Sequence, residues 1–171
     1  QRFSEIAQIS NDWIWEIDVN GMYTYVSPQI TNVLGYEQDD VVGKSPFDFM
    51  SEQEAQRVSK QFISLVQDAL PIQDLENWNI SKSGEMVCLL TNGVPIYDKK
   101  NTFLGYRGTD KDITKTRDLQ ETLQKQRDEL ETIFDTSKDG IGVLDLESNF
   151  LKINPAYIAI TGYTEEELLT K

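Results

Sequence analysis

The stretch from Glu85 to Thr114 constrains the fold more than any other part of this 171-residue sequence. Residues 85–97 are rich in valine, leucine, isoleucine and threonine, residues 98–101 are polar, and a second strand-like segment occupies residues 102–113. This pattern is typical of two antiparallel strands joined by a turn. Residues 72–80, before a Lys-Ser-Gly turn, indicate a third strand. The three segments predict a meander with one face available for a core.

Composition excludes several classes of function. The net charge is −13 and no basic run occurs, so we expect no binding to nucleic acid. Cys88 is the single cysteine, which excludes an internal disulfide and suits the reducing cytoplasm. No apolar run reaches the roughly 20 residues that span a bilayer. Because the chain begins at Gln1 rather than methionine, we treat it as a fragment, and a membrane segment outside it is compatible with the sequence.

The residues before the meander alternate between strand and helix patterns. Residues 3–10 have helical spacing, residues 13–18 alternate with period two, and Asn20-Gly21 is a hairpin turn signal. Ser51 followed by Glu54 is a capping box for the longest helix. The expected order is strand, strand, small helices, one longer helix and the meander, with the first five segments at residues 13–18, 22–26, 28–35, 37–43 and 51–69.

A heptad pattern follows the meander. Residues 114–134 carry apolar side chains at alternating spacings of three and four, with charged residues between them, which predicts a coiled coil. The predicted seam comprises Leu119, Leu123, Gln126, Leu130 and Ile133. Because so thin a seam does not stabilise an isolated helix, we expect a parallel homodimer through these residues. The alternative is an amphipathic helix that packs back on its own domain.

The chain then repeats itself. Shifted by 127 positions, Asp12, Asp18, Pro28 and Gly35 fall on an aspartate, an aspartate, a proline and a glycine. Identities at turns and helix starts are unlikely to arise by chance, because backbone geometry selects these residue types. The sequence therefore predicts a domain at residues 1–113, a signalling helix at 114–134, and the first part of a second copy at 135–171.

These motifs resemble those of PAS domains. The resemblance rests on W-I-W-E-I-D-x-N-G-x-Y-T-Y-V-S-P, then L-G-Y, K-S-G-E and L-G-Y-R-G-T-D-K-D-I-T in that order. It implies an α+β fold with a five-stranded antiparallel sheet in the order 2-1-5-4-3 and helices on one face. Tandem PAS repeats joined by coiled coils resemble the input regions of bacterial sensor histidine kinases and diguanylate cyclases.

Strand alternation indicates which side chains line a pocket between the sheet and the helices. On the first strand Trp13 and Trp15 are expected inside, and on the second strand Thr24 and Val26. The resemblance places further residues on the inner face. These candidate ligand-binding residues are Asn77, Asn79, Leu89, Thr91 and Arg107.

Arg107 is the sharpest of these candidates, because a guanidinium stays charged and needs an anionic partner when buried. One reading is a small organic anion as ligand, held by Arg107 with Asn79 and Thr91 and enclosed by Trp13 and Trp15. The other is an ion pair with an acid of the same domain, such as Asp48 or Glu76, with the tryptophans serving only as core. The residues leave both readings open.

The residue content argues against several cofactors and against catalysis. There is no histidine, so haem cannot bind through histidine and a Ser-His-Asp arrangement is impossible. Metal clusters of cysteine or histidine are missing, so no metal site is expected. Compared with flavin-binding photoreceptors, Asn79 matches, but Ser45-Pro46 stands at the adduct-forming cysteine and Leu89 and Arg107 replace two further polar residues, so flavin adduct chemistry is not expected.

We therefore expect a non-catalytic sensor. A ligand event would move the meander, and the last strand would pass it through Asp112, Ile113 and Thr114 to the coiled coil, with Thr114 capping the helix. An output domain, either a histidine kinase or a diguanylate cyclase, would follow in the same polypeptide beyond Lys171. The alternative is a domain without a ligand that serves as a scaffold for dimerisation and protein interaction.

Overall fold

A computed structural model describes residues 12–169 of the chain. They divide into two units, with the boundary between Arg117 and Asp118. The helix predicted at residues 3–10 lies outside the described residues.

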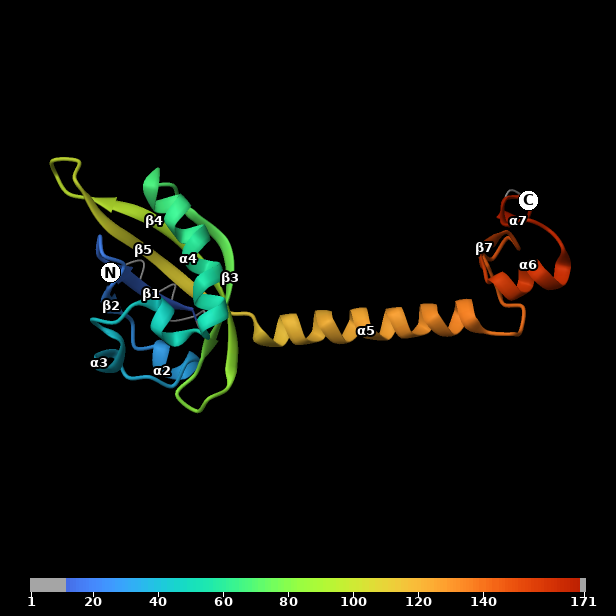
Figure 1. Ribbon diagram of the computed structural model, residues 1–171, viewed down its shortest axis with the longest axis horizontal. Helices are drawn as coiled ribbons and strands as arrows, with labels where there is room; N and C mark the ends of the chain where they lie inside the picture. The colour runs from blue at the N-terminus through green and yellow to red at the C-terminus, as the bar shows by residue number, and fades with distance from the viewer. Residues whose placement is uncertain (1–11, 170–171) are drawn as a thin grey trace. The chain divides into compact units, whose positions relative to one another are not determined.

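The first unit is built on a five-stranded antiparallel sheet (Figure 1). The strand order is β2-β1-β5-β4-β3, which confirms the order predicted from the sequence. The three long strands of the meander pair as consecutive neighbours. On the other side of β5, β1 pairs with it, so β1 and β2 extend the sheet. The strands are β1 Trp13–Ile17, β2 Tyr23–Val26, β3 Ile72–Ile80, β4 Met86–Tyr97 and β5 Phe103–Asp112.

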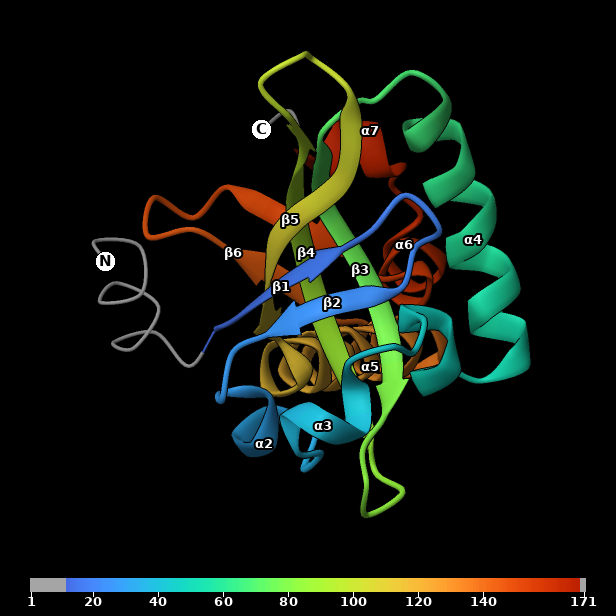
Figure 2. The ribbon, with the colours of Figure 1, turned by 90° about the vertical axis from the view of Figure 1, so that its left-hand side faces the viewer.

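The helices of the first unit lie between β2 and β3 in sequence. They are α2 Ile30–Val33, α3 Gln38–Val41, the 3-10 helix η1 Pro46–Phe49 and α4 Glu52–Gln67. The Ser51 side chain accepts a hydrogen bond from the Glu54 amide, so the predicted cap begins α4 as expected. Figure 2 shows α4 running alongside the sheet, next to β3.

The core lies between the inner face of the sheet and these helices. Burial of one such aliphatic or aromatic side chain contributes about 1.5–3 kcal/mol to stability. The most deeply buried members come from β1, β2, β4, β5 and the short helices: Trp13, Val26, Ile30, Val41, Leu89 and Tyr106. The core therefore combines inward-facing strand residues with residues of the short helices.

Two β-bulges interrupt the alternation of strand residues and reverse two predicted orientations. On β5, Phe103 pairs with Tyr97 but Gly105 pairs with Ile96, so Leu104 is an extra residue. Beyond it the inward-facing residue is Tyr106, not Arg107, because a shift of one residue exchanges the two faces of a strand.

The second bulge lies between β1 and β2. Glu16 pairs with Tyr25 and Ile17 with Tyr23, so Thr24 has no partner of its own. Thr24 is exposed whereas Tyr23 is buried, and the inward orientation predicted for Thr24 is therefore wrong.

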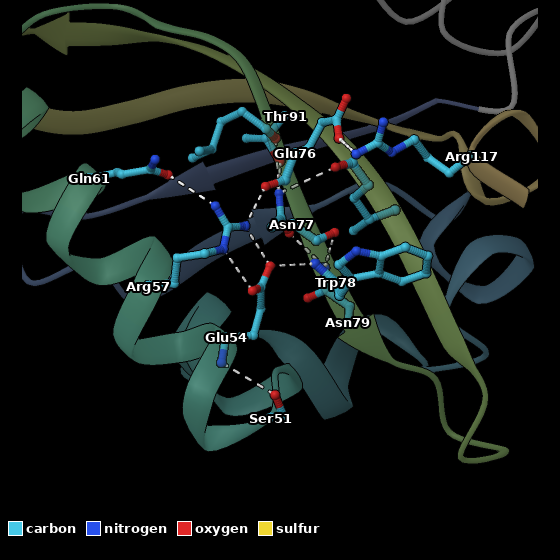
Figure 3. A network of polar contacts seen from close by, with 12 residues as sticks. Ser51, Glu54, Arg57, Gln61, Glu76, Asn77, Trp78, Asn79, Thr91 and Arg117 are labelled. Atoms are coloured by element: carbon cyan, nitrogen blue, oxygen red, sulfur yellow. Dashed lines mark hydrogen bonds and ion pairs between the residues drawn. The ribbon is translucent and has the colours of Figure 1, made fainter. Parts of the chain in front are cut away.

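The free edge of β3 is occupied by side chains of α4 (Figure 3). Glu54 accepts a hydrogen bond from the Trp78 amide at 2.9 Å, and Arg57 donates one to the Glu76 carbonyl at 2.7 Å. Arg57 also pairs with Glu54 at 2.6 Å. These contacts satisfy backbone groups that an edge strand otherwise leaves open.

The second unit contains the rest of the long helix α5 Thr114–Thr136, the hairpin strands β6 Gly142–Leu144 and β7 Phe150–Ile153, and the helices α6 Pro155–Thr161 and α7 Glu165–Leu169. The structure thus starts α5 at the predicted residue and extends it two residues beyond the predicted end.

The internal repeat is visible in matching hydrogen bonds. The Ile14 amide donates to the Ser27 side chain, and 127 residues later the Ile141 amide donates to the Asn154 side chain. The hairpin turns match as well. Asp18 and Asp145 each accept hydrogen bonds from the backbone amides two and four residues later. The two units therefore begin with the same local structure.

Candidate functional site: a cavity between the sheet and the helices

A cavity of about 50 Å³ lies between the sheet and the helices of the first unit. This volume holds a few water molecules or a very small organic molecule, since one water needs about 10–15 Å³. The walls are mostly apolar, and four polar residues of the sheet share one side of it. The lining residues include Trp15, Tyr23, Phe47, Phe62, Asn77, Asn79, Thr91 and Asp110.

The polar side chains form a hydrogen-bonded chain across β3, β4 and β5. Asn79 Nδ2 donates to Asn77 Oδ1 at 2.6 Å, and Asn77 Nδ2 donates to Thr91 Oγ1 at 2.8 Å. Thr91 hydrogen bonds to Asp110, which lies directly opposite it on β5. Trp15 Nε1 donates to Asp110 Oδ1 at 2.9 Å. The donors are thus directed towards one carboxyl group.

Asp110 is the buried ionisable residue of this site, with 4% of its surface exposed. Burial raises the pKa of its carboxyl group to about 7, against the effect of the hydrogen bonds from Thr91 and Trp15. Tyr23 lines the same cavity, and burial together with the nearby Asp110 raises the pKa of its hydroxyl well above the usual value. Asp110 therefore changes charge close to neutral pH.

Arg107 does not reach this cavity, and the orientation predicted for it is wrong. The bulge at Leu104 turns Arg107 to the outer face of the sheet, where 57% of its side chain is exposed. It pairs there with Glu16, at 2.6 Å between Nη2 and Oε1. The partner is therefore an acid of the same domain, although neither Asp48 nor Glu76 as suggested from the sequence.

The other predicted residues divide into two groups. Trp15 lines the cavity as strand alternation predicted, and Asn77, Asn79 and Thr91 line it as the resemblance implied. Trp13 and Leu89 are buried in the adjoining core and do not appear among the cavity walls. Among the described residues, the indole nitrogen of Trp13 is the one buried side-chain donor that lacks a hydrogen-bond partner.

Uninterrupted alternation along β5 predicts an outward-facing Asp110, so the sequence pattern does not identify it as a cavity residue. A signal existed in the sequence, because a glycine inside a strand often marks a bulge. Gly105 has φ +131°, and a Cβ at that position would lie 2.0 Å from the Ile17 carbonyl oxygen. Resetting the alternation after Gly105 places Asp110 inside.

The predicted coupling residues join β5 to α5 and fasten the joint to β4. The Ile113 amide donates to the Cys88 carbonyl, and the Cys88 amide donates to Thr114 Oγ1, both at 2.9 Å. Asp112 accepts hydrogen bonds from the Thr114 amide and hydroxyl. Thr114 is thus the first residue of the helix, and Asp112 supplies the cap that was predicted from Thr114.

A further contact ties the first turn of α5 to β3. Arg117 pairs with Glu76 at 2.8 Å between Nη2 and Oε2. Figure 3 shows this pair beside the Glu54 and Arg57 side chains that hold α4 to the same strand. The start of α5 therefore contacts two strands of the sheet, and sequence reasoning identified neither Glu76 nor Arg117 for this role.

Cys88, whose backbone bonds to Ile113 and Thr114 at this joint, is fully buried. Burial raises the pKa of its thiol to about 11, with a further contribution from Glu76. The thiol is therefore protonated at neutral pH and is a poor nucleophile.

The predicted seam residues of α5 are exposed on this single chain. Leu119, Leu123, Leu130 and Ile133 each expose more than half of their surface. No described helix is long and apolar enough to cross a membrane. Within residues 12–169 no group of three or more acidic or cysteine side chains is arranged to hold a metal ion.

Comparison with known proteins identifies the fold family. A family model described as a PAS domain matches residues 11–115, and a second PAS domain model matches residues 128–171. A search of curated proteins found no match. A PAS domain from Colwellia psychrerythraea has a TM-score of 0.58 at 20% identity, over 67% of this chain and 99% of its own.

Two solved structures from bacterial signalling proteins are also similar. A sensory box histidine kinase/response regulator from Burkholderia thailandensis has a TM-score of 0.63 at 19% identity, over 77% of this chain and 99% of its own. The N-terminal domain of a diguanylate cyclase with a PAS/PAC sensor from Marinobacter aquaeolei has a TM-score of 0.56 at 16% identity, over 62% and 98%. With its sheet order, its internal repeat and both family matches in agreement, this chain belongs to the PAS domain family.

Proposed function

We propose that the first unit is the sensory input of a larger bacterial signalling protein, in which a small molecule in the cavity is the signal. The observation that carries this proposal is the position of Asp110. It lies in the cavity wall and only four residues before Thr114, where α5 begins. A change at the carboxyl group therefore has a short covalent path to the helix.

The path has two supporting contacts. Thr91 hydrogen bonds to Asp110 from β4, and the same strand holds the joint through Cys88. Asn77 in the cavity is the neighbour of Glu76, whose carboxylate pairs with Arg117 in the first turn of α5. A ligand that rearranges the polar chain would thus shift β3 and β4 against the start of the helix.

We further propose that α5 forms a parallel coiled coil with a second copy and carries the signal to an output domain. The exposed leucines at heptad spacing support this step, since burial of such a seam is what stabilises paired helices. Gln126 in the seam weakens the pairing and would allow two closely similar packings of the helices. A histidine kinase or a diguanylate cyclase is the output domain that the similar proteins suggest.

The small size of the cavity favours a second candidate, a scaffold without a ligand. Pockets for drug-sized ligands measure about 300–1,000 Å³, and this cavity is far below that range. In such a scaffold the polar chain would stabilise the sheet, and the chain would act through dimerisation and partner binding alone.

Extraction and crosslinking together separate the two candidates. Small molecules are first extracted from the purified chain and identified by mass spectrometry. Single cysteines are then introduced at positions 119–133 in a Cys88→Ser background, and crosslinking between copies is compared with and without the extracted compound. A sensor requires a crosslinking pattern that depends on the compound, whereas an unchanged pattern, or an extract without any compound, favours the scaffold.

A further inference from the structure

The charge of the cavity wall has one source. Among the described residues that line the cavity, Asp110 is the only one that carries an acidic side chain, and none is a lysine or an arginine. An anion enclosed there would meet a carboxylate and no cation, which is costly at low solvent exposure. The loss of Arg107 from the site therefore removes the basis for the organic anion expected from the sequence.

The carboxyl group of Asp110 has acceptor capacity to spare. An ionised carboxylate offers about four acceptor positions, and Trp15 and Thr91 occupy two of them. The chain from Asn79 through Asn77 directs its N–H donors towards the same group. What the site lacks is a positive charge that neutralises the buried carboxylate.

The apolar walls suit a cation as well. Trp15 donates a hydrogen bond to Asp110, and Tyr23, Phe47 and Phe62 line the same cavity. The face of an aromatic ring attracts a cation by about 0.5–2 kcal/mol, more when water is excluded. A carboxylate combined with several aromatic rings is a chemistry that recognises ammonium groups.

We propose that the cavity binds a small organic ammonium ion, of the size of methylammonium, with Asp110 holding its charge. The inference rests on the proposed sensory function and specifies its ligand class. The cavity volume of about 50 Å³ limits the enclosed part of the ligand to a few non-hydrogen atoms. The net charge of −13 also favours the approach of a cation over that of an anion.

The test uses the chain of 171 residues and the indole N–H signals of its three tryptophans in a ¹H–¹⁵N correlation spectrum. Trp15 donates to Asp110 and reports on the cavity, while Trp78 lies outside the cavity wall and serves as an internal control. Methylammonium chloride, sodium acetate and acetamide are titrated separately at constant ionic strength. We expect a saturable shift of the Trp15 signal with methylammonium and little with acetate.

Two variants test the assignment of the charge. Asp110→Asn keeps the shape and is expected to weaken methylammonium binding at least about tenfold, the usual value of a hydrogen bond to a charged group. Glu16→Gln makes the same change in charge outside the cavity and should leave the affinity within about twofold.

Three results would overturn the inference: no saturable shift with methylammonium, tighter binding of acetate, or unchanged methylammonium affinity in Asp110→Asn. The wild-type titrations decide the matter even if that variant does not fold. Saturation by acetate or acetamide, but not by methylammonium, would reject the cation and leave the sensory proposal standing. Methylammonium binding without any change in the crosslinking of α5 would support the cation site and reject the sensory proposal.

Discussion

Burial of Asp110 makes the free energy of unfolding depend on pH. Its pKa is about 7 in the folded chain and near 3.8 when unfolded, so the folded state binds more protons between these values. Stability therefore falls as the pH rises from about 4 to about 7 and is level above that range. The total loss is up to about 4 kcal/mol, at 1.36 kcal/mol for each pKa unit.

Asp110→Asn should remove this dependence. We expect the variant to be more stable than the wild type at pH 8.5 and to show a smaller change between pH 5.5 and 8.5, measured by urea unfolding. Glu16→Gln controls for the change in net charge and should keep the wild-type slope. Tyr23, the other titratable group facing Asp110, stays neutral throughout, because its pKa lies well above this range. Parallel profiles for the wild type and Asp110→Asn would contradict the prediction.

Gly105 fixes which side chains of β5 face the cavity. A Cβ there would lie 2.0 Å from the Ile17 carbonyl oxygen, and φ is +131°. Gly105→Ala should therefore destabilise the chain by about 3 kcal/mol or more, beyond the roughly 1 kcal/mol cost of a left-handed backbone alone.

Gly43→Ala is the matched control for this substitution, because Gly43 has φ +85° and no atom within 4 Å of the added Cβ. Thermal unfolding of both variants compares the two costs. Equal losses would mean that the close approach of β5 to β1 contributes nothing.

At the scale of elements, the joint between β5 and α5 depends on the hydroxyl group of Thr114. It accepts a hydrogen bond from the Cys88 amide and donates one to Asp112. Thr114→Val keeps the shape and removes both bonds, so we expect a loss of about 1–2 kcal/mol and faster hydrogen exchange at Cys88.

Thr114→Ser retains the hydroxyl group and should restore slow exchange at Cys88 to near the wild-type rate. If valine and serine behave alike at this position, the joint is held by packing and by the Arg117–Glu76 pair instead.

At the scale of the whole molecule, the exposed seam of α5 predicts association between two chains. Leu123→Asp places a charge in the seam, whereas Thr132→Asp places the same charge on another face of the helix. Analytical ultracentrifugation should find the wild type and Thr132→Asp as dimers and Leu123→Asp as a monomer. If the wild-type chain remains monomeric at about 100 µM, a concentration at which weak coiled coils already associate, the proposed coiled-coil dimer is wrong.

The residue patterns of the sequence determined the element order, the start of α5 and the internal repeat, whereas the strand order of the sheet came only from the resemblance to PAS domains. The first three features follow from local patterns: period-two alternation, the Ser51 cap, the Asn20-Gly21 turn and the heptad spacing. Trp15 followed from the alternation of β1, and Asn77, Asn79 and Thr91 followed from the resemblance together with the uninterrupted alternation of β3 and β4 where they lie.

Only the tertiary structure decided the charge of the site. The bulge at Leu104 lies next to the close passage of Gly105 against Ile17, on a strand 88 residues away in sequence. The glycine is a local signal for a bulge, but it does not identify the distant strand that it contacts. One extra residue exchanged the two faces of β5, so Arg107 pairs with Glu16 on the outer face of the sheet and Asp110 lies in the cavity. The face on which a strand side chain lies depends on how many residues precede it in the strand. A single bulge adds one residue and therefore moves every following side chain to the opposite face.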